Sequence, residues 1–189
     1  MKPIWLMQPI PYLGEKLKGN WIWEPKIDGW RMQIIIHKTG KIEFWGRRLE
    51  KNPNWTEKLS YLIKIANNIF PKETLLDCEL YSSGGRRLLP SLFAKNPKVK
   101  PIIYLFDVIY LEGEFIANLT LEKRKNILDK IKVCPPFYIL KYFPLKNLEK
   151  ALTWSLKKGN EGIVIKKLSS RYEIGNDAPI ATQFWRKIK

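Results

Sequence analysis

The sequence predicts an α+β fold with largely antiparallel sheets. Segments with strand patterns outnumber helical segments, and the two kinds do not alternate regularly along the chain. Regular alternation would instead predict a parallel, doubly wound sheet, which fits this order poorly. The sequence has no repeat with a period of about 20–50 residues and no low-complexity linker. We therefore predict a single domain over residues 1–189.

Five segments have the composition of strands. Residues 32–36 and 41–45 are rich in β-branched and aromatic residues, and the short turn between them predicts a hairpin. Residues 74–81 and 101–111 are predominantly apolar, as is typical of buried strands, and the second is rich in Ile, Val, Tyr and Phe. Residues 161–166 are expected to form a strand with a small, flexible start.

Three helices are expected between these strands. Apolar residues with helical spacing over 59–70 predict the first, and an Asn-x-x-Glu pair that starts at Asn54 provides its capping signal. Thr120 caps the second helix, and the third runs from near Asn147 to Gly159. The expected apolar stripe of the second helix comprises Leu121, Ile127, Leu128 and Ile131.

The composition limits the classes of function. Lys and Arg total 34 against 18 for Asp and Glu, which gives a net charge of +16 and predicts a polyanionic partner such as nucleic acid. No apolar run approaches the roughly 18 residues of a membrane span, so no membrane association is expected. Two cysteines are too few for a disulfide framework, which favours a reduced compartment, the cytoplasm.

The inventory of reactive side chains narrows the chemistry further. His37 is the only histidine, and the sequence has no glycine-rich phosphate loop of the Walker type. Catalysis that depends on a histidine base is therefore excluded. Any acid–base or nucleophilic step falls to Lys, Asp or Glu.

The segment Glu-Pro-Lys-Ile-Asp-Gly-Trp-Arg, residues 24–31, is the most informative. Pro25 favours an extended entry, and the Asp-Gly pair predicts a tight turn before a strand. Such a turn can present Lys26 at a strand edge and return Arg31 to the same pocket. A lysine becomes a nucleophile only when its amine is neutral, which burial or neighbouring cations can arrange. The alternative is an ordinary hairpin with solvated charges.

Two carboxylates fit the same pocket. Glu79 lies in an apolar strand segment and Glu161 opens another. A carboxylate in such a position is costly unless it meets a cation, so each is either a structural salt bridge or part of a Mg²⁺ site. Lys187 and Lys189 lie on one side of the last segment if it is extended, which suggests a phosphate cradle or simply a basic tail.

Together these segments resemble the nucleotidyltransferase domain of the ATP-dependent DNA ligases, in order and through nearly the whole chain. Residues 26–31 are similar to the first ligase motif, whose lysine becomes covalently adenylated. The later motifs are matched by residues 42–47, 76–79, 104–110, 161–166 and 185–189. Lys-x-Asp-Gly alone would be weak support, whereas six ordered motifs are specific. The resemblance implies two largely antiparallel sheets flanked by helices, as in the fold of ligases and capping enzymes.

The resemblance also implies roles at the nucleoside end of the site. Lys26 would be the adenylated nucleophile. Glu24 would read adenine, and Phe106 would stack on it. Arg31 would lie near the ribose and phosphate, and Arg47 would contact one of them.

The same comparison implies roles at the phosphate end. Glu79 would lie near the ribose and, with Glu161, would bind the metal ion. Lys166, Lys187 and Lys189 would hold the α-phosphate of the nucleotide. The implied cofactors are ATP and Mg²⁺, with Mn²⁺ as a substitute.

The sequence departs from the ligase pattern in two places. Asn176 stands where many relatives have an arginine, which puts that nucleotide contact in doubt. The chain ends at Lys189, where an OB-fold domain would begin in ligases. We therefore expect that domain to be absent from this chain, and an OB-fold domain or another partner to act in trans.

The implied function is that of an ATP-dependent DNA ligase catalytic core, which forms a lysyl-AMP, transfers AMP to the 5′-phosphate of nicked double-stranded DNA and seals the nick. An RNA ligase or a GTP-dependent capping-type nucleotidyltransferase would share the lysine chemistry. A non-catalytic DNA-binding remnant could keep the same scaffold. A monomer is expected.

Overall fold

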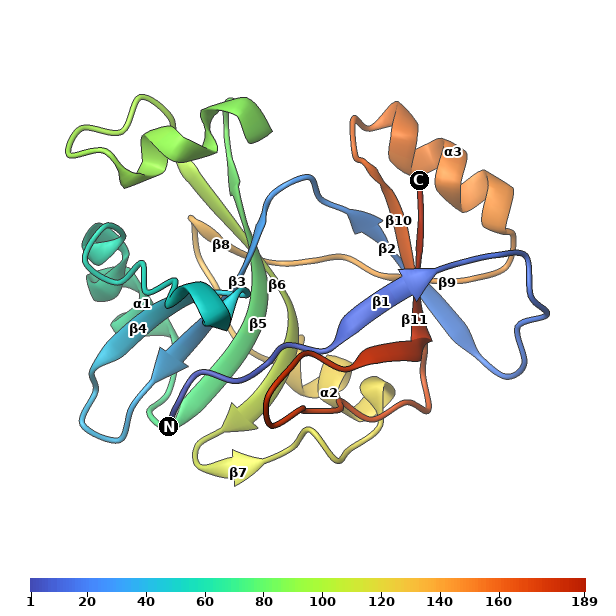
Figure 1. Cartoon of the computed structure of the whole chain (residues 1–189), viewed down its shortest axis with the longest axis horizontal. Helices are drawn as coiled ribbons and strands as arrows, with labels where there is room; N and C mark the ends of the chain where they lie inside the picture. Colours follow the sequence, from blue (N-terminus) through green and yellow to red (C-terminus); the bar gives the residue numbers. More distant parts are fainter.

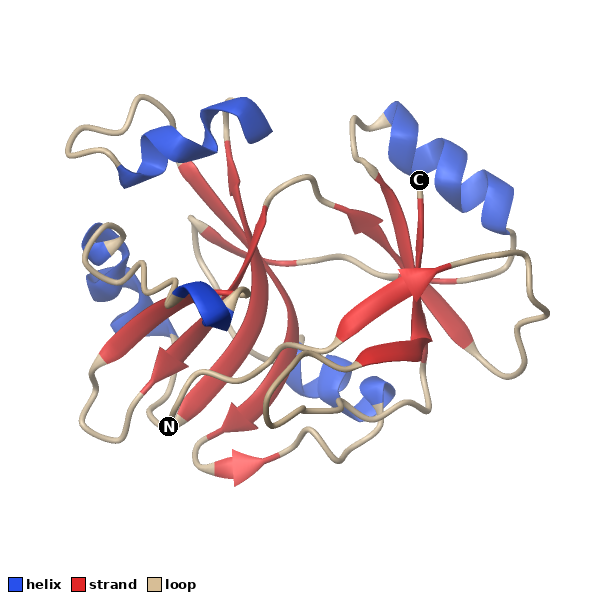
Figure 2. Cartoon of the chain, viewed as in Figure 1, coloured by secondary structure: helices blue, strands red, loops and turns tan.

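Two β-sheets form the framework of the structure, a computed structural model that describes all 189 residues (Figures 1 and 2). The five-stranded sheet has the order β1-β11-β10-β2-β9. Its strands are β1 (Gln8–Pro11), β2 (Trp21–Lys26), β9 (Phe143–Pro144), β10 (Gly162–Lys167) and β11 (Ala181–Ile188).

The six-stranded sheet has the order β4-β3-β5-β6-β7, with β8 paired to β6. Its strands are β3 (Trp30–Ile36), β4 (Ile42–Gly46), β5 (Thr74–Ser82), β6 (Pro101–Leu111), β7 (Glu114–Phe115) and β8 (Phe137–Ile139). Apart from the parallel pairs β1–β11 and β6–β8, every strand pair is antiparallel. The predicted α+β class with two largely antiparallel sheets is confirmed.

The helices lie at the periphery of the two sheets (Figure 2). The α-helices are α1 (Ile63–Ile69), α2 (Leu121–Leu128) and α3 (Leu148–Lys157). Three 3₁₀ segments are η1 (Leu49–Lys51), η2 (Ser60–Leu62) and η3 (Arg86–Phe93). None of these helices has the length and hydropathy that crossing a bilayer requires.

The first expected helix is shorter than the spacing of its apolar residues predicts. Only residues 63–69 are α-helical, and they follow a 3₁₀ turn at 60–62. Asn54 does not cap the helix, because its side-chain oxygen accepts a hydrogen bond from the Thr56 N–H at 3.0 Å. Asparagine closes local turns as readily as it caps helices, so the capping signal in the sequence was misread.

The caps of the other two helices are as predicted, whereas the buried face of α2 differs from the predicted apolar stripe. The Thr120 side chain accepts from the Lys123 N–H at 3.4 Å, and Asn147 accepts from the Lys150 N–H at 2.8 Å. Ile131, however, lies beyond the end of α2. The buried residues of that helix are Leu121, Arg124, Lys125 and Leu128.

The core is divided according to the two sheets. A cluster of 20 buried residues packs within and around the six-stranded sheet. A second cluster of 10 buried residues joins the sheets, because it contains Phe106 of β6 and Trp185 of β11. Strand β3, which lies between β4 and β5, buries both faces at its end: Ile34 belongs to the first cluster and Ile35 to the second. This explains why residues 34–36 are an unbroken apolar run, whereas Arg31 and Gln33 alternate with apolar residues earlier in the strand.

The chain crosses from one sheet to the other at residues 27–29. β2 ends at Lys26 in the five-stranded sheet, and β3 begins at Trp30 in the six-stranded sheet. This connection is the blue segment that passes between the two halves in Figure 1. Gly29 is required here because a Cβ would lie 2.3 Å from the carbonyl oxygen of Leu80. The predicted Asp-Gly turn therefore lies at the junction of the sheets.

Gly162 and Gly159 provide a matched test of the close approach between β10 and β11. Both have positive φ angles, 151° and 80°, but only at Gly162 would a Cβ clash, at 2.0 Å from the carbonyl oxygen of Ile188. We expect Gly159→Ala to cost about 1–2 kcal/mol of unfolding free energy through its backbone conformation. Gly162→Ala should cost about 1–3 kcal/mol more, because the strands must separate. Urea unfolding of both variants measures the difference, and equal losses would contradict this packing.

Candidate active site

A cleft of about 670 Å³ is lined by residues of both sheets. All of the site residues predicted from the sequence line it, although they come from distant parts of the chain. These residues are Glu24, Lys26, Arg31, Arg47, Glu79, Phe106, Glu161, Lys166, Lys187 and Lys189. Asn176 is exposed and lies outside the cleft lining.

Strand pairing brings Lys26 and Glu161 together. β2 and β10 are antiparallel with Lys26 opposite Gly162, and the Glu161 N–H donates to the Lys26 carbonyl oxygen at 2.9 Å. The Lys26 ammonium forms an ion pair with Glu161 Oε2, and Lys189 pairs with Glu161 Oε1. One carboxylate thus bridges two lysines from opposite ends of the sequence. Burial by itself would raise the pKa of Glu161, but hydrogen bonds from Lys189 and Lys26 outweigh it and lower the pKa.

Glu79 approaches the same region from the six-stranded sheet. Its backbone is paired with Arg31 across β5 and β3. Burial raises the pKa of Glu79 to about 8, against the opposing effect of Arg31, Lys26 and Arg47. Burial thus favours the neutral form of this carboxyl group, whereas a bound cation would favour its ionised form.

The two carboxylates at the cleft could hold a metal ion only together with ligands from substrate and water. Nowhere in the chain do three or more His, Cys, Asp or Glu side chains converge as a ready-made metal site. Glu79 and Glu161 line the cleft from different sheets and offer hard oxygen ligands. Such a pair fits Mg²⁺ that takes most of its ligands from substrate phosphates and water.

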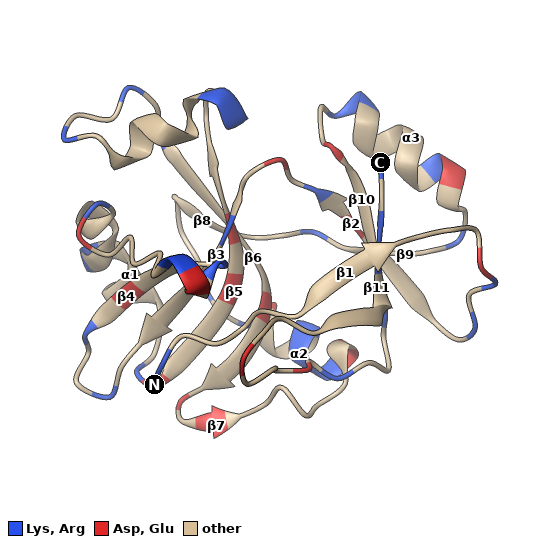
Figure 3. Cartoon of the chain, in the orientation of Figure 1, with Lys and Arg blue, Asp and Glu red and all other residues tan.

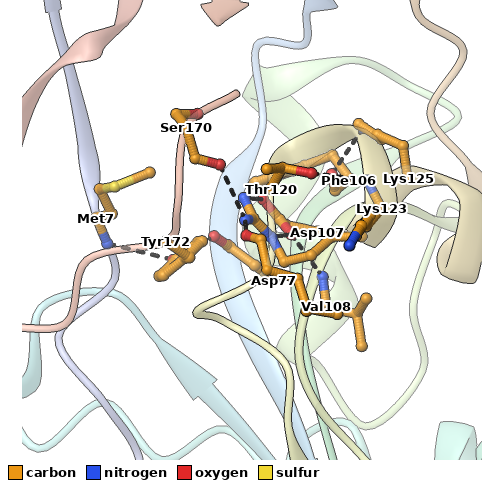
Figure 4. A network of polar contacts seen from close by, with 12 residues as sticks. Met7, Asp77, Phe106, Asp107, Val108, Thr120, Lys123, Lys125, Ser170 and Tyr172 are labelled. Carbon is orange, nitrogen blue, oxygen red and sulfur yellow. Dashed lines mark hydrogen bonds and ion pairs between the residues drawn. The ribbon is translucent and has the colours of Figure 1, made fainter. Parts of the chain in front are cut away.

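Hydrogen bonds fix the orientation of Arg31 in the lining of the cleft. Its guanidinium makes two hydrogen bonds to Asp77, at 3.0 and 2.6 Å. Asp77 also accepts from the Tyr172 hydroxyl at 2.6 Å (Figure 4 labels Asp77 and Tyr172). Burial lowers the pKa of Arg31, but the charge and hydrogen bonds of Asp77, together with Tyr172 and Glu79, outweigh burial and raise the pKa above its ordinary value. The guanidinium carbon lies 5.5 Å from the centre of the Phe106 ring, so the cation also packs against that aromatic face.

Glu24 is buried between two lysines at the closed end of the cleft. Its Oε2 lies 2.7 Å from the Lys166 ammonium, and its Oε1 pairs with Lys125. Burial lowers the pKa of Lys166 to about 8, with Glu24 opposing the shift and Lys125 adding to it. The Lys166 ammonium is 4.5 Å from the ring centre of Phe106 and 3.9 Å from that of Trp185. This end of the cleft therefore combines aromatic surface with a carboxylate whose position is fixed by two cations.

A further buried ion pair, between Arg124 and Asp107, anchors α2 to β6 near this region. Arg124 and Asp107 are both fully buried and form two hydrogen bonds, at 2.7 and 3.0 Å (Figure 4 shows the contacts of Asp107). Arg124 also donates to the carbonyl oxygen of Leu119 at 2.6 Å. Burial would raise the pKa of Asp107, but Arg124 outweighs it and holds the pKa below its usual value.

Sequence reasoning missed four of these buried polar residues. They are Asp77, Arg124, Lys125 and Tyr172. Asp77 lies two residues before Glu79 and therefore on the same face of β5, a spacing that could have identified it. On α2, Leu121, Arg124, Lys125 and Leu128 have the spacing i, i+3, i+4, i+7 of a buried face, which the search for apolar residues alone overlooked.

The rim of the cleft carries further cations. Arg48 and Lys51, near η1, and Arg86, which begins η3, line it and were not singled out from the sequence. Arg86 forms an ion pair with Asp28 at 2.5 Å and so ties η3 to the turn after Lys26. Lys and Arg outnumber Asp and Glu around both halves of the molecule (Figure 3). The cleft can therefore hold a polyanion next to the lysine.

The two sheets and the lysine between them define a nucleotidyltransferase domain. Residues 6–189 match the profile of the ATP dependent DNA ligase domain, and the chain belongs to this family. A DNA ligase 4 from Candida glabrata is 30% identical over 205 residues, which cover 94% of this chain and 21% of the relative. A DNA ligase from Thermococcus fumicolans is 27% identical over 193 residues, which cover 92% of this chain and 33% of the relative. The chain thus spans between a fifth and a third of these relatives.

Solved structures show the same fold. A mycobacterial DNA ligase D complexed with ATP and MES superposes with a TM-score of 0.70 at 20% identity, over 96% of this chain and 59% of that one. The Chlorella virus DNA ligase-adenylate superposes with a TM-score of 0.60 at 20% identity, over 97% of this chain and 68% of that one. The family predicted from the ordered motifs is confirmed.

Removal of the cation from the Arg124–Asp107 pair should reveal how much the fold depends on it. Arg124→Met leaves a buried, unpaired carboxylate, so we expect a loss of about 3–5 kcal/mol of unfolding free energy at neutral pH. In the unchanged protein the pKa of Asp107 is lower than in the unfolded chain. The pair therefore stabilises the fold above the usual Asp range, and this contribution is lost as pH falls through the folded pKa.

In Arg124→Met, by contrast, the destabilisation caused by Asp107 should decrease as the pH is lowered. Without Arg124, burial raises the pKa of Asp107, and protonation removes the unpaired charge. The difference in stability between the two proteins should then shrink from pH 7 towards the usual Asp range. Urea unfolding over this interval measures it, and a difference that does not change with pH would mean that Asp107 is not the group responsible.

Proposed function

We propose that this domain is the catalytic core of an ATP-dependent DNA ligase that forms a covalent lysyl-AMP on Lys26. The observation that carries the proposal is the arrangement at the end of β2. Lys26 emerges into the cleft beside Glu161, with Lys189 on the same carboxylate. A lysine that a carboxylate holds at a cleft, with a second cation on the same carboxylate, is placed for nucleophilic attack on a phosphate.

The closed end of the cleft is the proposed adenosine site. Phe106, Trp185 and Leu140 provide apolar surface there, and Glu24 provides a carboxylate. An aromatic ring offers a base stacking energy of about 1–3 kcal/mol. A carboxylate accepts a hydrogen bond from the 6-amino group of adenine, whereas guanine presents a carbonyl oxygen at the same position. These features support a preference for ATP.

In the proposed first step, Lys26 gives up one proton to solvent and, as the neutral amine, attacks the α-phosphorus of ATP with its nitrogen lone pair, and the nitrogen loses a second proton to solvent once the P–N bond has formed. A P–N bond forms, the bond from the α-phosphorus to the bridging oxygen breaks, and pyrophosphate leaves with the electron pair of that bond. Lys166, Lys187 and Lys189 line the same cleft and would balance the negative charge on the α-phosphate.

Glu79 and Glu161 are the groups of this chain that would hold Mg²⁺. A bound Mg²⁺ would supply charge stabilisation at the phosphate oxygens. Side chains of this domain would add to the charge stabilisation by orienting the phosphates. Arg31, held rigidly by Asp77, and Arg47 at the cleft rim are placed to do so.

The later steps are proposed to take place on nicked double-stranded DNA. AMP would pass from Lys26 to the 5′-phosphate at the nick, and the 3′-hydroxyl would then displace it. The net charge of +16 and the cations at the cleft rim support binding to the DNA backbone, which would weaken steeply with salt. A monomeric chain that cooperates with an OB-fold domain remains our expectation.

The first test is the intact mass of the protein after incubation with ATP and Mg²⁺. The wild-type chain should gain one adenylyl group, and Lys26→Ala should gain none, because the nucleophile is missing. Lys150→Ala, an exposed lysine on α3 outside the cleft, should gain the group as the wild type does. The same incubation with GTP should leave the mass unchanged.

The remaining outcomes separate the alternatives. Labelling by GTP in place of ATP would indicate a capping-type enzyme. If the wild type gains no mass, a pre-adenylated nick shows whether the chain can still seal DNA. Failure of both reactions, with DNA affinity intact in the wild type and in Lys26→Ala, would indicate a binding module.

The metal proposal is tested by Glu161→Gln. The amide can still accept a hydrogen bond from Lys26, but it binds Mg²⁺ far more weakly than a carboxylate does. We expect the Mg²⁺ concentration for half-maximal adenylation to rise at least about tenfold. An unchanged Mg²⁺ requirement with a uniformly lower rate would mean that Glu161 acts on Lys26 alone.

A further inference from the structure

Lys125 is a buried lysine that has no place in the steps described above. It projects from the inner face of α2, is 1% exposed, and does not line the cleft. A lysine is rarely buried to this extent unless its ammonium group is paired. Its contacts therefore indicate what it contributes.

The ammonium of Lys125 connects the two groups proposed to recognise the base. It pairs with Oε1 of Glu24, and it donates to the carbonyl oxygen of Phe106 at 2.7 Å (Figure 4 shows the contact with Phe106). It also lies 5.0 Å from the ring centre of Tyr142. One side chain thus links β2 of the five-stranded sheet, β6 of the six-stranded sheet and α2.

The second lysine on Glu24 differs in position. Lys166 pairs with Oε2 and itself lines the cleft, whereas Lys125 approaches from behind. Lys166 would be drawn towards a bound phosphate, because it is one of the cations at the cleft. Lys125 does not line the cleft, its ammonium is held by Glu24 and by the Phe106 carbonyl oxygen, and its helix is anchored by the buried Arg124–Asp107 pair. We therefore expect its contact with Glu24 to persist when a nucleotide enters.

We propose that Lys125 is a positioning residue that sets the choice of nucleobase by holding the Glu24 carboxylate and the Phe106 backbone in one geometry. This inference rests on the proposed ATP-binding function of the cleft. The held carboxylate can accept from an adenine amino group but cannot rotate away from a guanine carbonyl oxygen. If Glu24 could rotate freely, its hydrogen bond with the adenine amino group would become weaker. Its repulsion from the guanine carbonyl oxygen would also decrease.

The experiment measures equilibrium binding of ATP and of GTP to the full chain by titration calorimetry without Mg²⁺, so that the lysyl-AMP of the proposed function does not form during the titration. In the wild type, ATP should bind more tightly than GTP. Lys125→Met, which keeps the length and apolar stem of the side chain, should lower the ratio of ATP to GTP affinity at least about tenfold. Lys123→Met is the matched control, because Lys123 lies on the same helix and is exposed. It should leave the ratio unchanged.

A double-mutant cycle separates positioning from a loss of structure. Glu24→Gln should also reduce the selectivity, and Lys125→Met should cause no further change in that background, because its effect passes through Glu24. The double variant removes both charges and so leaves no unpaired carboxylate from this contact. Urea unfolding of each variant shows whether it is folded.

The outcomes distinguish the inference from the function on which it rests. If the wild type binds ATP selectively and Lys125→Met keeps that ratio, the inference is wrong and the proposed function stands. If the two substitutions lower the selectivity additively, Lys125 does not act through Glu24 and the inference is also wrong. If the wild type binds neither nucleotide, the proposed function fails and the inference falls with it.

Discussion

The antiparallel pairing of β2 with β10 is the constraint on which the site depends. Because Lys26 lies opposite Gly162, the preceding residue, Glu161, comes beside it without any contribution from side-chain packing. β11 pairs with the other edge of β10 and brings Lys189 to the same carboxylate. Backbone hydrogen bonds hold these positions far more firmly than flexible side chains could. A lysine that must meet a phosphate is thereby given a defined starting point.

Charge burial is the second organising feature, and it fixes geometry more than it adds stability. The ion pairs of Glu24, Asp77 and Asp107 are all withdrawn from water. A buried pair often adds little net stability, because desolvation offsets the attraction between the charges. Loss of one partner is nevertheless costly, so each pair strongly disfavours alternative arrangements. In this domain the pairs join α2 and both sheets around the closed end of the cleft, the region that we propose holds the base.

Much of the fold and of the site could be read from local patterns. The strands β3, β4, β5, β6 and β10 were recognisable because they are rich in β-branched, aromatic and other apolar residues. The other six strands were not predicted, because they are short or have polar and proline residues among the apolar ones. The caps at Thr120 and Asn147 were correct, whereas Asn54 was misread because the same side chain also closes turns. The site residues were found through ordered motifs, since none of them is distinctive when taken alone. Arg124 and Lys125 were missed because a basic residue on a helix is ordinarily assigned to the surface.

The sequence by itself determined the α+β class, the family and the ten site residues that the structure brings to one cleft. These properties reside in local composition and in the order of motifs, which do not require knowledge of the contacts between distant segments. The tertiary structure alone decided which charges are paired, which carboxyl group has a raised pKa, which further cations line the cleft, and which basic residues of α2 point inward. Such properties depend on burial and on distances of a few ångströms between segments far apart in sequence, and a linear pattern does not contain them.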